Sequence, residues 1–282
     1  MKNFKKIILI TLVCVSFLVS FGCAKPDSSV QPAGDAASSG VKTAATVEDQ
    51  VQQVSITVSA AASLKDAMEE IKQLYAEEKP NVEITYNFGA SGSLQQQIEQ
   101  GAPVDVFMSA ATKQMDALKE KELMIDGTVK NLLLNKVVLV EEKDAGLVKD
   151  FKDLADDKVK KIALGEPKSV PVGQYAEEII SFLEIKDKVG PKSIYGKDVK
   201  EVLTWVETGN ADVGVVYETD AKVSEKVSIA AYAPENSHKP VVYPVGVVKA
   251  TKSADAAKEF LEFLLGDKSK TVFEKFGFTV YA

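Results

Sequence analysis

An apolar strand pattern gives way to a helical pattern at four places, and three of them carry small hydroxyl residues or glycines. These junctions are residues 59–64 (SAAASL), 89–94 (GASGSL), 170–173 (VPVG) and 197–199 (KDV). The first turn of a helix leaves backbone N–H groups without partners and lies at the positive end of the helix dipole, so it attracts anions. Small side chains let a ligand approach that backbone closely. The four junctions together predict an anion-binding site.

Each junction alone also has an ordinary structural explanation. Ser63 is followed three residues later by Asp66, as in a capping box, and Ser91 could be only a helix cap or a turn residue. Pro171 and Gly173 could serve only to shape a loop. Because four such junctions occur in one chain without a catalytic constellation, the binding interpretation is favoured.

Candidates for catalysis are few. His238 is the only histidine, and the two cysteines, Cys14 and Cys23, lie at the extreme N-terminus. The folded part therefore offers no cysteine- or histidine-based metal cluster, and we expect no direct cation ligands and no cofactor. We interpret Asp105 as structural and His238 as a loop residue, and we expect Trp205 to pack against its neighbours.

Charge limits the possible partners further. The net charge of −7 argues against a nucleic-acid partner. All 34 basic residues are lysines, so an anion clamp built on a guanidinium group is excluded.

The N-terminus has the pattern of an export signal. Three lysines precede an apolar run, residues 7–19, which is too short for a comfortable membrane span. Residues 1–22 are therefore predicted to be a signal peptide. Gly22 before Cys23 resembles a bacterial lipoprotein cleavage site, although Ser20 and Phe21 depart from the usual pattern. The alternative is a plain secretory peptide with an incidental cysteine.

The segment that follows is expected to be a flexible tether. Residues 23–53 are rich in Ser, Ala, Gly, Pro and Gln and cannot bury enough apolar surface to order themselves. We expect an extracytoplasmic protein anchored to the cell membrane through lipidated Cys23.

Strand and helix patterns alternate from residue 54 onward. The expected strands are 54–58, 82–86, 104–108, 137–140, 162–164, 213–217 and 242–248. The expected helices are 64–75, 94–99, 112–121, 175–183, 199–206 and 260–264. This alternation predicts α/β layers with mostly parallel sheets, and the length suits two lobes. Ligands in such folds bind at the carboxyl ends of the strands, where the four junctions lie.

Residues 54–278 resemble the periplasmic molybdate-binding protein family of ABC transporters. The resemblance is carried by VSAAASLKDAMEEI, FGASGSLQQQIEQGAPVDVFMSA, LGEPKSVPVGQYAEE, VGVVYETDA and PENSHKPVVYPVGVV, in that order. It implies a two-lobed, type II periplasmic-binding-protein fold with the ligand cleft between the lobes. Lobe I would comprise 54–133 plus about 242–282, and lobe II about 134–241. It also implies a monomer that delivers its ligand to a membrane permease.

The resemblance implies a particular set of binding residues. These are the hydroxyls of Ser63, Ser91 and Tyr217 and the backbone amides of Val172 and Val199. Val172 stands where the resemblance leads us to expect alanine, but only the backbone amide is used. The turn around Ser91 is richer in glycine than expected, which could change the contacts of that serine. Molybdenum would be bound as molybdate by these residues, not as a cation.

The chemistry of the ligand agrees with this set of donors. Molybdate and tungstate are dianions that only accept hydrogen bonds, and dispersed dipoles in a dry cleft can stabilise them. Phosphate keeps a proton near neutral pH and benefits from a carboxylate acceptor, such as the nearby Asp66, Asp198 or Glu218. Sulfate is the rival ligand. Two other classes stay open: an exported enzyme on the same scaffold, and an adhesin or sensor that lost transport.

Overall fold

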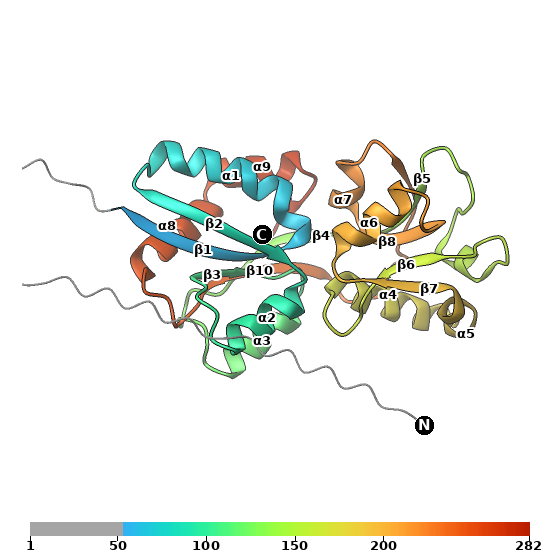
Figure 1. Cartoon of the computed structure of the whole chain (residues 1–282), viewed down its shortest axis with the longest axis horizontal. Coiled ribbons are helices and arrows are strands. Elements are labelled where there is room, and N and C mark those ends of the chain that lie inside the picture. Colours follow the sequence, from blue (N-terminus) through green and yellow to red (C-terminus); the bar gives the residue numbers. More distant parts are fainter. Residues whose placement is uncertain (1–52) are drawn as a thin grey trace, which may run out of the picture. The chain divides into compact units, whose positions relative to one another are not determined.

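The computed structural model describes residues 53–282, which lie within one compact unit. The predicted signal peptide, Cys23 and nearly all of the predicted tether lie outside these residues. No helix of the described part is both long and apolar enough to cross a membrane. The strands form two separate sheets, each covered by helices (Figure 1).

The first sheet has six strands in the order β11-β4-β10-β3-β1-β2. Its strands are β1 (Val54–Ala61), β2 (Val82–Gly89), β3 (Val106–Met108), β4 (Lys130–Asn135), β10 (Val241–Val247) and β11 (Thr279–Val280). Its helices are the 3-10 turn η1 (Ala62–Leu64), α1 (Lys65–Glu78), α2 (Ser91–Glu99), α3 (Thr112–Glu120), α8 (Ala254–Leu265) and α9 (Asp267–Lys275). Figure 1 shows α1 and α9 on one side of this sheet and α2 and α3 on the other.

Apolar side chains hold these layers together. Along β1, Ile56, Val58 and Ala60 are fully buried, and because alternate residues of a strand share a face, they mark a face of the sheet that is packed into the core. A separate core cluster under α2 and α3 includes Leu94, Phe107 and Leu118.

The second sheet has five strands in the order β7-β6-β8-β5-β9. Its strands are β5 (Val137–Glu142), β6 (Ile162–Gly165), β7 (Ser193–Gly196), β8 (Val213–Tyr217) and β9 (Val227–Tyr232). Its helices are η2 (Phe151–Ala155), α4 (Pro171–Phe182), α5 (Lys186–Val189), η3 (Gly190–Lys192), α6 (Val199–Glu207) and α7 (Glu218–Lys222). Both α4 and α6 pack on β6 and β8.

The expectation of mostly parallel sheets is wrong, since both sheets are mixed. β1 is parallel to β2 and β3, and β6 is parallel to β7 and β8. β10 is antiparallel to both of its main neighbours, β3 and β4, and β5 is antiparallel to β8 and β9. β5 and β10 are the strands at which the chain arrives from the other sheet. Each follows a short connection, without the helical crossover that a parallel pair needs.

The chain passes between the sheets twice. Lys136 alone separates β4 from β5, and residues 233–240 connect β9 to β10. The sequence predicts the boundary near residue 134, whereas β4 pairs with β10 through Asn135. We therefore propose Lys136 and residues 233–240 as the boundaries between two lobes, each made of one sheet with its helices.

Candidate anion-binding site

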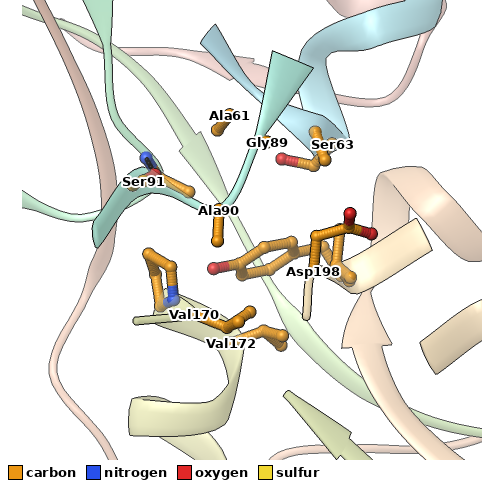
Figure 2. Close-up of a pocket in the computed structure, with 13 residues that line it drawn as sticks. Ala61, Ser63, Gly89, Ala90, Ser91, Val170, Val172 and Asp198 are labelled. Atoms are coloured by element: carbon orange, nitrogen blue, oxygen red, sulfur yellow. Dashed lines mark hydrogen bonds between the residues drawn. The ribbon is translucent and has the colours of Figure 1, made fainter. Parts of the chain in front are cut away.

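A small cavity lies between the two lobes, where several helices begin (Figure 2). It is lined by Ala61, Ala62, Ser63, Gly89, Ala90, Ser91 and Ala110 of the first lobe, and by Val170, Pro171, Val172, Asp198, Val199 and Tyr217 of the second. The space not occupied by atoms is about 210 Å³, part of it open to solvent. Because this figure includes open solvent, the enclosed part of the cavity is smaller still. The dimensions therefore suit a small ion.

All five binding residues implied by the resemblance line this one cavity. They are Ser63, Ser91, Val172, Val199 and Tyr217. Three of them lie at or just after the end of a strand: Ser63 is in the η1 turn after β1, Ser91 begins α2 after β2, and Tyr217 is the last residue of β8. Val199 begins α6 and Val172 is the second residue of α4. The carboxyl ends of strands from both sheets thus meet around the cavity.

Ser91 is held by the backbone of the neighbouring loop. Its fully buried Oγ accepts a hydrogen bond from the Ala110 N–H at 2.9 Å. The explanation of Ser91 as a helix cap is wrong, because the N-cap of α2 is Ala90 and no side chain caps that helix. Since the oxygen already accepts a bond, the hydroxyl proton is left to donate to a ligand.

Ser63 is held by a tyrosine far away in the sequence. Its Oγ lies 2.8 Å from the Oη of Tyr243, on β10. The explanation of Ser63 and Asp66 as a capping box is wrong, since neither η1 nor α1 has a side-chain cap. The carboxylate of Asp66 instead pairs with Lys200 Nζ at 2.8 Å.

The second lobe contributes the first turns of two helices. The amides of Val172 and Val199 belong to these first turns, whose N–H groups have no acceptor within their own helix. At the start of α4 a Cβ on Gly173 would lie 2.1 Å from the carbonyl oxygen of Gly165, so only glycine allows the helix to begin this close to β6. At the start of α6, Asp198 Oδ1 accepts the Glu201 N–H at 2.9 Å as an N-cap.

Tyr217 supplies a buried hydroxyl with no partner. Only 1% of the residue is exposed, and its Oη has no hydrogen-bond partner among residues 53–282. Burial, and to a smaller extent the neighbouring Tyr243, raises the pKa of Tyr217 well above its usual value, so the phenol stays protonated at neutral pH. An unsatisfied buried donor costs about 1–3 kcal/mol, which an acceptor on a ligand would relieve.

One carboxylate borders the cavity. Asp198 is a lining residue, although one of its oxygens is engaged in capping α6. Glu218 lies elsewhere and accepts a hydrogen bond from Tyr232 Oη at 2.9 Å. The remaining lining residues carry no charged side chain, so an anion here would meet neutral donors rather than a countercharge.

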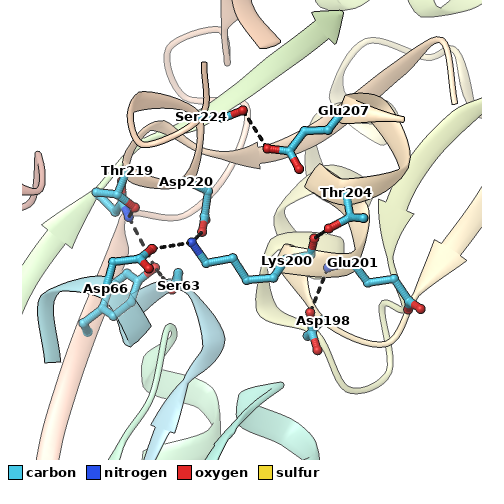
Figure 3. A network of polar contacts seen from close by, with 12 residues as sticks. Ser63, Asp66, Asp198, Lys200, Glu201, Thr204, Glu207, Thr219, Asp220 and Ser224 are labelled. Atoms are coloured by element: carbon cyan, nitrogen blue, oxygen red, sulfur yellow. Dashed lines mark hydrogen bonds and ion pairs between the residues drawn. The ribbon is translucent and has the colours of Figure 1, made fainter. Parts of the chain in front are cut away.

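Polar contacts join the lobes beside the cavity. Lys200 of α6 reaches Asp66 of α1, and it also pairs with the buried Asp220 of α7 at 3.2 Å (Figure 3). From the α2 side, the N–H of Gly92 donates to the carbonyl oxygen of Ser169 at 2.9 Å. The described arrangement is therefore one in which the lobes touch each other around the cavity.

The other residues singled out from the sequence lie away from this cavity. Within residues 53–282, no group of three or more His, Cys, Asp or Glu side chains could hold a metal ion. His238 is in the loop after β9, with Nδ1 2.6 Å from the Lys239 carbonyl oxygen. Asp105 accepts the Thr57 N–H at 2.7 Å, and Trp205 packs half-buried against the core.

Two lobes that meet around a small, donor-rich cavity at the carboxyl ends of their strands define a solute-binding protein of the periplasmic-binding type. The sequence model of the bacterial extracellular solute-binding protein family matches residues 56–279, and the chain belongs to this family.

Similar proteins and solved structures agree with this assignment. The chain is 43% identical to YvgL of Bacillus subtilis, assigned to the substrate-binding lipoproteins of ABC transporters, over 98% of this chain and 99% of YvgL. It is 41% identical to the molybdate-binding protein ModA of Haemophilus influenzae, over 79% of this chain and 89% of that protein. Among solved structures, the substrate-binding domain assigned to a molybdenum ABC transporter of Clostridium difficile is similar with a TM-score of 0.64 and 50% identity, over 82% of this chain and all of that domain.

Proposed function

We propose that this protein captures molybdate, and also tungstate, outside the cytoplasm and delivers it to the permease of an ABC importer. The observation that carries the proposal is that five residues from both lobes, each with a suitable hydrogen-bond donor, line one small cavity. The donors are the hydroxyls of Ser63, Ser91 and Tyr217 and the amides of Val172 and Val199. The unpartnered hydroxyl of Tyr217 supports an occupant that accepts hydrogen bonds.

The choice of a tetrahedral dianion rests on charge and hydrogen bonding. Molybdate and tungstate carry only acceptors at neutral pH, and neutral donors in a closed cavity can stabilise them without a countercharge. The relatives named for molybdate or molybdenum point to the same ligand. Sulfate satisfies the same donors and differs mainly in size, so it is the ligand against which molybdate must be compared.

A binding role is favoured over catalysis. The cavity has no nucleophile with an adjacent base, and the only histidine of the chain lies in the loop after β9. A monomer suits this role, because both halves of the cavity come from one chain.

Titration of the purified protein with molybdate, tungstate, sulfate and phosphate tests the ligand. Ser63→Ala and Ser91→Ala should each weaken molybdate binding about ten- to a hundredfold, since each removes a hydrogen bond to a charged group worth about 1.5–3 kcal/mol. Tyr217→Phe removes the phenol hydroxyl alone and should also weaken binding. If all three variants bind molybdate like the wild type, the site is wrong. Tighter binding of sulfate than of molybdate would make the protein a sulfate binder.

Anchoring through Cys23 is proposed on the sequence pattern Gly22-Cys23, and the relative YvgL, assigned to the lipoproteins, supports it. Cys23→Ala should release the protein from membranes or block its processing. The measurement is fractionation of expressing cells, with mass spectrometry of the mature N-terminus. An unmodified mature chain that begins at another residue would refute lipidation at Cys23.

A further inference from the structure

A chain of side-chain hydrogen bonds runs from the first crossing between the sheets to the cavity. Asn135, the last residue of β4, has its Nδ2 3.3 Å from Tyr243 Oη. Tyr243 Oη lies 2.8 Å from Ser63 Oγ, which borders the cavity. Tyr243 is almost fully buried and does not itself line the cavity. Tyr243 therefore contacts Ser63 from outside the lining of the cavity, and Asn135 contacts Tyr243 in turn.

The amide of Asn135 gives this chain a direction. Its Oδ1 accepts the Lys136 N–H at 2.8 Å, and its Nδ2 also donates to Thr219 Oγ1 of α7 at 2.9 Å. The nitrogen end of the amide is thus the one that faces Tyr243, and it can only donate. Tyr243 Oη accepts from Asn135, so its single proton is available to Ser63 Oγ. Ser63 Oγ then accepts, and its own proton is left to point toward the cavity.

We infer that Tyr243 and Asn135 are positioning residues that turn the hydroxyl proton of Ser63 toward the bound oxyanion. The inference rests on the proposed function, in which Ser63 donates to the ligand. An oxyanion offers acceptors only. If the Ser63 hydroxyl donated its hydrogen bond to Tyr243, it would present a lone pair to the ligand and repel it. Burial raises the pKa of Tyr243 well above its usual value, which keeps the phenol protonated as the donor that this direction requires.

A double-mutant cycle tests the inference, with molybdate affinity measured by calorimetry. Tyr243→Phe keeps the ring and removes the bond to Ser63, and it should weaken binding about two- to tenfold. Ser63→Ala should weaken it about ten- to a hundredfold. In the double variant, Tyr243→Phe should cost nothing beyond Ser63→Ala, because it acts only through that hydroxyl. A tyrosine that mattered only for packing would add its full loss in both backgrounds.

Tyr75→Phe is the matched control. Tyr75 is also buried, and its Oη has no partner among the described residues, but it packs against Phe260 and Phe263 away from the cavity. Its affinity for molybdate should equal that of the wild type.

Asn135→Asp provides a second, independent variant. A carboxylate at this position can only accept, so Tyr243 would donate to it and Ser63 would donate to Tyr243. The loss of affinity should exceed that of Tyr243→Phe. It should shrink in the Ser63→Ala background to the part caused by the added charge, which does not depend on Ser63.

The outcomes separate the inference from the proposed function. Wild-type protein that binds neither molybdate nor tungstate would overturn both. A second outcome refutes only the roles of Tyr243 and Asn135. In that outcome the wild type binds molybdate and Ser63→Ala weakens binding, but Tyr243→Phe or Asn135→Asp loses as much affinity in the Ser63→Ala background as in the wild type. Wild-type affinity in Tyr243→Phe has the same consequence. Should Tyr243→Phe fail to fold, the cycle with Asn135→Asp decides alone.

Discussion

Asp220 is a carboxylate with no exposed surface, and its environment makes stability depend on pH. Burial raises its pKa from 3.8 to about 6, and the ion pair with Lys200 offsets only part of that rise. Between about pH 4 and 6 the folded protein therefore holds a proton that the unfolded chain has released. The contribution of Asp220 to the free energy of unfolding consequently falls as the pH rises through this window. A shift of about two units corresponds to about 3 kcal/mol.

Asp220→Asn should remove this dependence. Relative to the wild type, its free energy of unfolding should rise between pH 4 and pH 7 by up to about 3 kcal/mol. Urea unfolding at several pH values measures it, and the contributions of all other groups cancel in the comparison. Asp66→Asn is the control, because it removes the half-exposed partner of the same lysine. Parallel pH profiles of wild type and Asp220→Asn would contradict the assignment.

At the scale of residues, the sequence predicted the lining of the cavity better than what lies behind it. Ser63, Ser91 and Tyr217 could be found because each sits in a short local motif at the end of a strand. Tyr243 could not be found in this way, because it is separated from Ser63 by 180 positions in the sequence. The sequence around it has the pattern of an ordinary buried strand. The contact between Ser91 and Ala110 likewise depends on how two strands pair.

At the scale of elements, the start of α2 determines how closely the lobes can approach. A Cβ on Gly92 would lie 2.6 Å from the carbonyl oxygen of Ser169 in the opposite lobe. Gly92→Ala should therefore disfavour the closed state and weaken molybdate binding about five- to a hundredfold, as overpacking costs about 1–3 kcal/mol. The melting temperature without ligand should not fall, because the three heavy atoms nearest to that Cβ all belong to Ser169 of the opposite lobe and the contact is relieved when the lobes separate.

Gly190→Ala is the matched control for this substitution. It adds the same methyl group where no heavy atom lies within 4 Å, so affinity should stay unchanged. Wild-type affinity in Gly92→Ala would show that the lobes close without this contact.

The elements that the sequence missed are those with weak patterns. The edge strands β7 and β9 are half-exposed and show no clear alternation, and β4 reads KNLLLN, an apolar run without alternation. The helix α9 is strongly polar, so the sequence shows no clear helical pattern after residue 264. The well-buried elements, such as β1 and α6, lie where the apolar spacing predicted them, with ends that differ by a few residues. The mixed sheets were missed because periodicity does not reveal the direction of a strand.

At the scale of the whole molecule, the ligand should hold the two lobes together. Each lobe supplies part of the cavity, so an anion bound to both favours the closed state by its differential affinity. At about a hundred times its dissociation constant, molybdate should add about 2.7 kcal/mol of stability, which is a rise of roughly 5–10 °C in melting temperature. Phosphate should add less than molybdate, because the five donors offer its proton no acceptor and Oδ1 of the one lining carboxylate, Asp198, already accepts the Glu201 N–H.

Thermal melts and X-ray scattering with each anion measure these effects. Tungstate should act like molybdate, and sulfate should act weakly, since a smaller tetrahedron reaches donors on both lobes less well. Compaction by phosphate alone would contradict the argument that the cavity mainly offers donors.

The lack of a cationic side chain in the lining of the cavity has a consequence for the kinetics of capture. The protein carries a net charge of −7, and no lysine lines the cavity to attract a dianion. At long range, protein and ligand therefore repel each other, and dissolved salt screens that repulsion over a Debye length of about 10 Å at 0.1 M. The association rate of molybdate should consequently rise with ionic strength, whereas lysine-lined anion sites capture more slowly as salt is added. With such a dependence, capture of the anion would be faster in a medium of higher ionic strength.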